Sequence, residues 1–384
     1  MYLDCNATTP LDPRVLEAML PALRESFGNA SSIHWFGQQA RAAIDEAREA
    51  IARLIGATPQ EIVFTGSGTE ADNMALRGAA WRAREPRRKI VYSTIEHHAV
   101  LNTARALAEE GWPVESVGAT SEGRVDLDAL ADTVDERTAL VAVMLANNET
   151  GAIQDVAEVA RIARRHGALV HCDAVQAAGK IEIDVRALDV DLLALSAHKF
   201  YGPKGTGALY VRRNTRLAAL LRGGAQERNR RAGTENVAGI VGLGRAALLA
   251  REELPGDAAR VAALRDRLQA RLLELPDVRV NGSGARVPNT TNVSFGGIDA
   301  ESLLMGLDLM GVAVSTGAAC AAGAVEPSHV LRAMGLSPER VQGSLRLSLG
   351  RFSSEADVER GAAAIGEAVE RQRSSKRKAA VARA

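Results

Sequence analysis

The residue most clearly placed to take part in a reaction is a lysine at the end of an apolar run. Lys199 follows VDLLALSA, which has the length and composition of a buried strand. Burying an unpaired ammonium is costly, and desolvation lowers the pKa of a lysine and makes its amine nucleophilic. Such an amine is suited to a Schiff base with an aldehyde. Asp173 ends a second apolar run, GALVHCDA, in the same way.

The stretch FTGSGTEADN, residues 64–73, could bind an anion. A predicted strand runs into Gly66 and Gly68, and Thr69 then opens a helix with Glu70 in its first turn. Glycines let backbone N–H groups approach an anion, and a helix N-terminus adds partial positive charge. The pattern is neither a Walker loop nor GxGxxG, so by itself it fits an ordinary capped turn equally well.

An aldehyde-binding lysine, an anion site and a buried acid together indicate pyridoxal 5′-phosphate (PLP). Lys199 would bind the aldehyde, and Asp173 would keep the pyridinium nitrogen protonated so that the ring withdraws electrons. Gln176, three residues after Asp173, could reach the phenolic oxygen of the ring. The phosphate would be bound by Gly68, Thr69, Ser196 and His198.

Further polar residues follow other apolar runs. His97, in STIEHHAV, could stack on the ring and exchange protons, whereas His98 should point elsewhere. Asn147 and Asn148, in LANNETG, could orient a substrate carboxylate or a cofactor oxygen, and the alternative is turn formation, which Asn and Gly favour. Arg346 alternates with leucines in SLRLSLG, so it lies on the opposite strand face from them and could clamp a carboxylate.

Two kinds of pattern must position these side chains. Over residues 38–250, helical segments alternate with apolar runs at 61–65, 89–94, 138–146, 167–174 and 190–197. This alternation predicts an α/β fold with a mostly parallel sheet covered by helices, in which ligands bind beyond the carboxyl ends of the strands. From about residue 255 a long helix precedes predicted strands at 290–295, 312–316 and 344–350, which indicates a smaller α+β domain.

The composition excludes several classes of protein. Lys plus Arg and Asp plus Glu number 47 each, so no overall charge favours nucleic acid or an acidic membrane surface. The N-terminal MYLDCNATTP does not resemble a signal peptide, and no apolar run approaches the ~20 residues of a membrane-spanning helix. Three cysteines without a CxxC pair predict a reducing compartment, and we expect a cytoplasmic protein without a metal.

One of the three cysteines lies in an unusual setting. Cys320 is surrounded by alanines and glycines in VSTGAACAAGAVEPSHV, residues 314–330, where a thiol has little to pack against. Cys172 lies in an apolar run and is expected to be buried and inert. Cys5 adjoins Asp4, and nothing in its surroundings supports a second redox thiol.

The whole chain resembles the cysteine desulfurases of the NifS/IscS type, which are fold-type I, class-V aminotransferase-like PLP enzymes. The resemblance runs from YLDCNATTPLDPRV to GSLRLSLGRF and rests on ordered motifs, which are GNASSIHWFG, TGSGTEADN, IEHHAVLNT, ANNETG, DAVQAAGKI, LSAHKFYGPKGTGALYVRR, QERNRRAGTEN and EPSHVLRAMG. It implies a large PLP-binding domain over residues 16–255 with a mostly parallel seven-stranded sheet. It also implies a small domain, from residues 1–15 and 256–384, that carries the cysteine loop.

The resemblance assigns roles to the residues above. Lys199, Asp173, Gln176 and the four phosphate-binding residues would hold PLP, His97 would be the stacking acid/base, and Asn148 and Arg346 would hold substrate and cofactor oxygens. Thr234, in RAGTEN, would reach the phosphate in the partner subunit, which implies a homodimer with shared active sites.

The resemblance also gives Cys320 a role. Its thiolate would attack the sulfur of bound L-cysteine, giving L-alanine and a persulfide for an acceptor such as an iron–sulfur scaffold protein. A selenocysteine lyase or another β-eliminating PLP enzyme is the alternative on the same scaffold, and its products would differ. An aminotransferase needs no loop cysteine. A catalytically silent scaffold would not need the full set of Lys199, Asp173, His97 and Cys320.

Overall fold

The alternating segments form one seven-stranded sheet. In the computed structural model, which describes residues 1–316, 320–321 and 324–381, the strand order is β1-β7-β6-β5-β4-β2-β3. Strands β6, β5, β4, β2 and β3 pair in parallel, and β7 is antiparallel to both β1 and β6. The strands are β1 Ile62–Thr65, β2 Lys89–Ser93, β3 Val114–Val117, β4 Thr138–Ala142, β5 Leu169–Asp173, β6 Leu192–Ser196 and β7 Gly207–Val211. The prediction of a mostly parallel sheet is confirmed.

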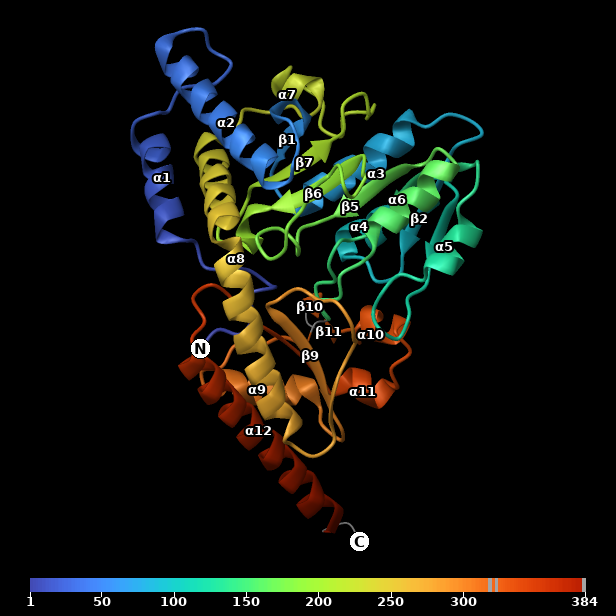
Figure 1. Cartoon of the computed structure of the whole chain (residues 1–384), viewed down its shortest axis with the longest axis vertical. Helices are drawn as coiled ribbons and strands as arrows, with labels where there is room; N and C mark the ends of the chain where they lie inside the picture. Colours follow the sequence, from blue (N-terminus) through green and yellow to red (C-terminus); the bar gives the residue numbers. More distant parts are fainter. Residues whose placement is uncertain (317–319, 322–323, 382–384) are drawn as a thin grey trace.

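Helices cover both faces of this sheet (Figure 1). Because side chains alternate along a strand, Val63 of β1 packs with one helix layer while Ile62 and Phe64 pack with the other. Helices α3 and α4 form the first layer, and α2, α6 and part of α8 (Val237–Leu273) lie on the opposite face. The helices of this lobe are α1 Pro13–Arg24, α2 Trp35–Leu54, α3 Gly68–Arg82, α4 His98–Glu109, α5 Leu127–Thr133, α6 Val156–Arg165 and α7 Gln226–Asn229, with short 3₁₀ turns η1 Pro59–Glu61 and η2 Ala197–Lys199.

A smaller lobe lies below the large sheet in Figure 1. Its antiparallel sheet has the order β12-β9-β8, and its core includes Leu345 and Leu347 on one face of β12. Its other elements include a short antiparallel pair, β10 with β11. The elements are β8 Val278–Val280, β9 Thr290–Phe295, α9 Ala300–Leu309, β10 Cys320–Ala321, β11 Ala324–Val325, α10 His329–Ala333, α11 Pro338–Gln342, β12 Ser344–Ser348 and α12 Glu355–Val381.

The strand predicted at 312–316 does not form. Ala313 makes an isolated bridge to Tyr2 of the N-terminal segment, and Ser315 makes another to Arg346 of β12. The segment divides its pairing between two neighbours, so neither ladder extends beyond one bridge. This competition is non-local and leaves no trace in the apolar pattern.

One helix joins the two lobes. Helix α8, Val237–Leu273, is continuous through Pro255, and its C-terminal half packs in the small-lobe core through Val261, Leu264 and Leu268. The two cores are separate clusters along this helix. The domain boundary at residue 255 therefore falls inside an unbroken helix, and it stays a prediction.

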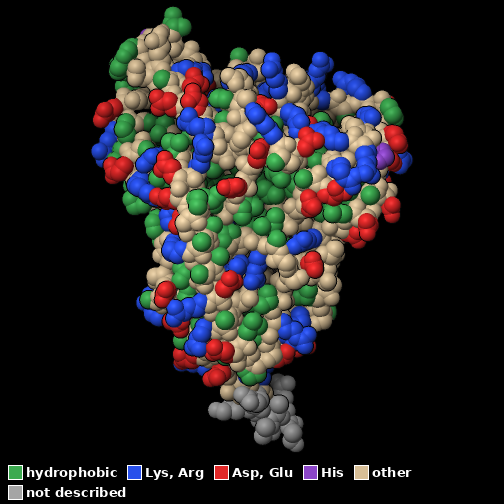
Figure 2. Space-filling model, viewed as in Figure 1, with side chains coloured by type: hydrophobic (Ala, Val, Ile, Leu, Met, Phe, Trp, Pro, Cys, Tyr) green, Lys and Arg blue, Asp and Glu red, His purple; other side chains and the backbone are tan. Residues whose placement is uncertain are grey.

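The surface is mixed in charge. On the face shown in Figure 2, Lys and Arg side chains are interspersed with Asp and Glu, as the equal numbers of the two in the sequence suggest. No helix among the described residues combines the length and hydropathy needed to cross a membrane.

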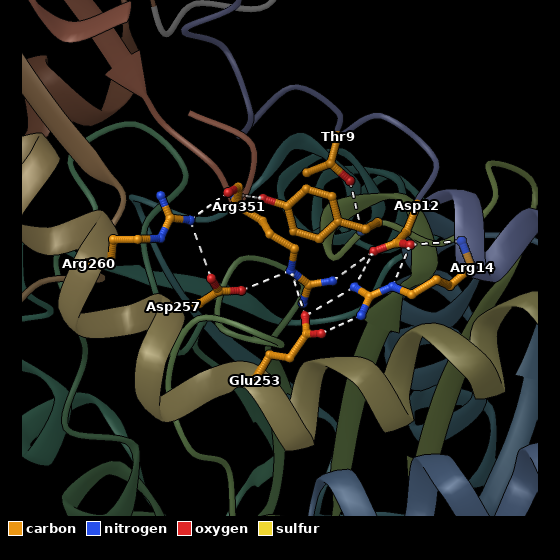
Figure 3. A network of polar contacts seen from close by, with 8 residues as sticks. Thr9, Asp12, Arg14, Glu253, Asp257, Arg260 and Arg351 are labelled. Carbon is orange, nitrogen blue, oxygen red and sulfur yellow. Dashed lines mark hydrogen bonds and ion pairs between the residues drawn. The ribbon is translucent and has the colours of Figure 1, made fainter. Parts of the chain in front are cut away.

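A network of ion pairs and hydrogen bonds connects the two lobes at the point where α8 passes from one to the other (Figure 3). The buried carboxylate of Asp12 accepts hydrogen bonds from Arg14 Nη2 at 2.8 Å and from Arg351 Nη1 at 3.0 Å. Arg351 also donates to Asp257 of α8 at 2.8 Å and lies over the ring of Tyr201 at 4.7 Å. Asp12 thus links the segment that precedes α1 to Arg351, which follows β12.

We expect Asp12→Asn to lower the free energy of unfolding by about 2 kcal/mol at pH 7, because two arginines lose a buried anionic partner. Hydrogen bonds from Arg14 and Arg351 lower the pKa of Asp12 to about 2. A depressed carboxyl pKa stabilises the fold above about pH 4, and this contribution is lost as the pH falls from about 4 towards 2.

Urea denaturation at pH 7 and pH 3 tests this expectation, with the exposed Asp132→Asn on α5 as the matched control. The gap between wild type and Asp12→Asn should narrow at pH 3. A gap that is equally wide at both pH values would contradict the assigned role of the ionised carboxylate.

Candidate active site

The polar residues that follow the strands meet in one cavity at the carboxyl edge of the sheet. The cavity has a volume of about 240 Å³. Nine of the residues selected from the sequence line it, namely Gly68, Thr69, His97, Asn148, Asp173, Gln176, Ser196, His198 and Lys199, together with Ser67, Asp72, Met144 and Val175. The sheet topology explains this convergence, because parallel strands present their carboxyl ends at one edge.

Lys199 ends the 3₁₀ turn η2, directly after β6. Its ammonium donates to the backbone carbonyls of Asn6 at 2.6 Å and Ala7 at 2.8 Å. Burial, aided by the nearby charge of Arg346, lowers the pKa of Lys199 to about 8. A larger fraction of the amine is therefore unprotonated near neutral pH than in an ordinary lysine, and that fraction can attack an aldehyde.

Two buried carboxyl groups lie at the floor of the cavity. Asp173 accepts a hydrogen bond from the Val175 amide at 2.9 Å, and Asp72 contacts the ring nitrogen Nε2 of buried His171 at 2.9 Å. Desolvation raises the pKa of both carboxyl groups, and the Asp173 charge raises that of Asp72 further. A cationic ring nitrogen placed against Asp173 would offset this cost.

The other end of the cavity has the features of an anion-binding site. Ser67 caps α3 by accepting from the Glu70 amide at 3.0 Å. The first N–H groups of any helix have no partner within the helix, so those that precede Glu70 are free to bind an anion. A Cβ at Gly68 would lie 2.7 Å from the Val175 side chain and 3.3 Å from that of Ser196, so a larger residue would force Val175 to move. His198 faces this end and contacts the hydroxyl of Thr8 at 3.1 Å.

The two adjacent histidines have different surroundings, as predicted. His97 lines the cavity, and its Nδ1 accepts from the Ala99 amide at 3.1 Å, which leaves the proton of the neutral ring on Nε2. Partial desolvation of the ring beside the cavity and the charge of Lys199 lower the pKa of His97 to about 4. His98 instead packs against the ring of His329, with ring centroids 5.0 Å apart.

The two adjacent asparagines separate in the same manner. Asn147 organises the turn, because its Oδ1 accepts from the amides of Glu149 and Thr150 at 2.9 Å. Asn148 lines the cavity, and its buried Oδ1 has no partner among the described residues. Turn formation thus explains Asn147, whereas Asn148 is available to a ligand.

Arg346 lies on the face of β12 opposite Leu345 and Leu347, as its alternation predicts, but outside the residues that line the cavity. Its Nη2 is paired with Asp4 at 2.7 Å, and its Nη1 donates to the Asn148 carbonyl at 3.1 Å. The Nε atom is buried and has no partner among the described residues. Arg346 therefore borders the cavity with its Nε unpartnered among the described residues.

Thr234, like Arg346, is not among the described residues that line the cavity. Thr234 is exposed on the single chain, in the loop that Arg231 links to the N-terminus of α3 by an ion pair with Glu70 at 2.8 Å. The backbone of Cys320 begins β10, while its side chain lies outside the described residues.

The end of the cysteine segment is anchored beside the cavity. Ser328 caps α10, and its hydroxyl donates to buried Glu149 at 2.5 Å. His329 contacts the Glu96 carbonyl at 3.0 Å, next to His97 in the chain. The segment that carries Cys320 thus contacts Glu149, which follows Asn148 in the chain, and Glu96, which precedes His97.

The sequence analysis missed several residues of this site. Asn6 is 1 % exposed, and its backbone carbonyl accepts from both Lys199 and Gln176 while its side chain contacts Lys180. Asp72 completes the cavity floor. Both lie in quoted motifs, but neither follows a strand directly, so the signal that selected the other residues did not apply to them.

The remaining thiols are unsuited to chemistry. Cys5 and Cys172 are free and buried. Burial raises the pKa of Cys5 to about 12 and raises that of Cys172 as well. Both therefore stay protonated, and the expectation that Cys172 is buried is confirmed.

PLP fits the residues that are present. The unpartnered Asn148 oxygen, the restricted space at Gly68 and the buried carboxylate of Asp173 are features that a cofactor of this chemistry would use. Lys199 would hold its aldehyde, and the N-terminus of α3 would hold its phosphate. The geometry is therefore compatible with the cofactor that the sequence indicated.

The chain is similar to known proteins over nearly its full length. Residues 1–360 match the family model of the class-V aminotransferases. A "Cysteine desulfurase" from a Nostoc species is 48% identical over 97% of this chain and 94% of its own, and a "Cysteine desulfurase IscS" from Anaeromyxobacter dehalogenans is 49% identical over 97% and 93%. A solved structure described as a "NifS-like protein" is 40% identical with a TM-score of 0.91, covering 96% of this chain and 99% of that one.

Proposed function

Because the chain belongs to the class-V aminotransferase family, and within it to the cysteine desulfurases of the NifS/IscS type, we propose that it converts L-cysteine to L-alanine with PLP. The sulfur is left as a persulfide on Cys320 and then passed to an acceptor protein for iron–sulfur cluster assembly or other sulfur transfer. The observation that carries the proposal is the cavity of about 240 Å³ that Lys199 and Asp173 line together with seven other residues selected from the sequence.

The reaction balances without an external oxidant. The Cys320 thiolate attacks the substrate sulfur, the C–S bond breaks and an S–S bond forms. The electron pair of the broken bond stays on the substrate carbon, which takes a proton and becomes the methyl group of L-alanine. When bound, PLP supplies an electron sink that makes the bonds at the substrate α-carbon labile.

The residues of the chain divide the remaining work. Lys199 would bind the cofactor aldehyde and later move a proton, and Asp173 would hold a proton on the ring nitrogen. Neutral His97 would exchange a proton through Nε2 over the ring. The unused Nε of Arg346 would bind the substrate carboxylate, with Asn148 beside it. The phosphate would lie against Gly68, Thr69, Ser196 and His198.

The proposed assembly is a homodimer. Thr234 is exposed on the single chain, and its loop is tied to the phosphate-binding end of the cavity through Arg231 and Glu70. From this position Thr234 would reach the phosphate in the partner subunit. The proposed setting is the cytoplasm, with a protein rather than nucleic acid or membrane as the sulfur acceptor.

The decisive experiment incubates the PLP-loaded protein with L-cysteine and measures L-alanine together with persulfide on Cys320. Equal first-turnover amounts of the two products are expected. L-Alanine with free sulfide and no persulfide would instead indicate a lyase. If the PLP-loaded protein formed neither L-alanine nor persulfide, the proposal would be contradicted.

A further inference from the structure

A second buried lysine lies beside the cofactor cavity. Lys180 is 8 % exposed and follows Gly179 in the turn after β5. Its ammonium donates to Gln176 Oε1 at 2.6 Å and to Asn6 Oδ1 at 3.2 Å. Within the described part of the chain, no carboxylate lies within ion-pair distance of it. Burying an ammonium among neutral oxygens costs free energy of folding, so we expect the charge to serve a function.

The contact fixes how the Gln176 amide is oriented. An ammonium has only donors, so Lys180 requires the oxygen of the amide and turns the nitrogen away. The nitrogen Nε2 donates one N–H to the Asn6 carbonyl at 2.9 Å. Gln176 lines the cavity, so its second N–H is available to a ligand.

Asn6 holds the other side of Lys180 equally firmly. Its Nδ2 donates to the Asn148 carbonyl at 3.1 Å and to Thr290 at 2.8 Å, which directs Oδ1 towards Lys180. Oδ1 also accepts from Asn289 at 2.9 Å. The ammonium therefore has a fixed position at the edge of the cavity.

The charges around Lys180 are mostly positive. Burial and the nearby ammonium of Lys199 lower the pKa of Lys180 to about 7, and Arg346 acts in the same direction. Cys5 is the neighbouring acidic group. Asp4 and Asp173 act on Lys199 rather than on Lys180. An anionic oxygen bound at Gln176 would relieve this excess of positive charge.

We propose that Lys180 is a positioning residue that directs the Gln176 N–H at the phenolic oxygen of PLP and stabilises the negative charge of that oxygen. The proposal rests on the proposed function, since it needs PLP bound to Lys199. The positive charge also disfavours a proton on the nitrogen that links Lys199 to the cofactor. Lys180 therefore lowers the pH at which the visible absorption of the bound cofactor changes.

The test is a spectroscopic pH titration of PLP-loaded wild type and Lys180→Met. The variant should titrate about one pH unit higher, as expected for losing one charge at short range in a partly buried site. It should also release PLP faster during dialysis. Lys376→Met removes the same charge from exposed α12 and should titrate like wild type.

The possible outcomes distinguish a wrong role for Lys180 from a wrong function for the protein. A folded Lys180→Met that titrates at the wild-type pH overturns the role of Lys180. Should Lys180→Met fail to fold, Lys180→Gln, which keeps a donor without the charge, must show the same upward shift, and an unshifted titration overturns the role equally. A wild type that shows no PLP absorption overturns the proposed function itself.

Discussion

Replacing Lys199 by alanine is expected to abolish both the visible absorption of covalently bound PLP and the turnover of L-cysteine. Lys199 is the described lysine that lines the cavity, and its partial burial lowers the pKa of the amine to about 8. Without it, the cofactor has no covalent attachment and the reacting centre loses a proton carrier. We expect a loss of about 10³-fold or more in kcat/KM.

The same variant should fold normally. Lys199 contributes two hydrogen bonds to backbone carbonyls of the N-terminal segment, at Asn6 and Ala7, and those carbonyls can bind water instead. Thermal unfolding of the PLP-free proteins should therefore give similar midpoints, and exposed Lys376→Ala is the matched control. A Lys199→Ala protein that keeps the wild-type absorption band would show that another amine binds the cofactor.

Local patterns were sufficient to predict the central sheet and most of its functional edge. Short apolar runs at β4, β5 and β6 indicated buried parallel strands, and the polar residue after each run had to lie at one edge. Asp173, Ser196 and Lys199 could be selected on this basis alone. The cavity brings them together as expected.

The residues that the sequence reading missed act across long distances in the chain. Asn6 contacts Gln176, Lys180 and Lys199, all more than 160 positions away, and a pattern within a short window carries no information about such contacts. The failed strand at 312–316 has the same cause, because its pairing partners lie in the N-terminal segment and in β12. Non-local competition decided both features.

Arg346 shows how a correct placement can still be incomplete. Alternation with leucines placed it on the right face of β12, but its ion pair with Asp4 could not be foreseen from that strand. A substrate carboxylate would have to use Nε or share the guanidinium with Asp4. Charge balance at the site therefore includes a residue of the N-terminal segment.

Replacing Cys320 by alanine is expected to separate cofactor chemistry from sulfur transfer. PLP should bind as in wild type, since the residues that line the cavity are unchanged. L-Cysteine should still alter the spectrum of the bound cofactor, whereas L-alanine release should fall by about 10³-fold or more, because the nucleophile for the substrate sulfur is absent. Stopped-flow absorption and quenched single-turnover assays measure the two steps separately.

Cys5→Ala is the matched control for this experiment. Burial raises the pKa of the Cys5 thiol to about 12, so it supplies no thiolate near neutral pH, and its removal should leave persulfide formation intact. If Cys320→Ala released L-alanine at the wild-type rate, sulfur would have to leave without that thiol. The small-residue segment at 314–330 would then have no part in the chemistry. A loss confined to Cys320→Ala would instead assign it as the arm that accepts sulfur, anchored at Ser328 beside the site where sulfur is released.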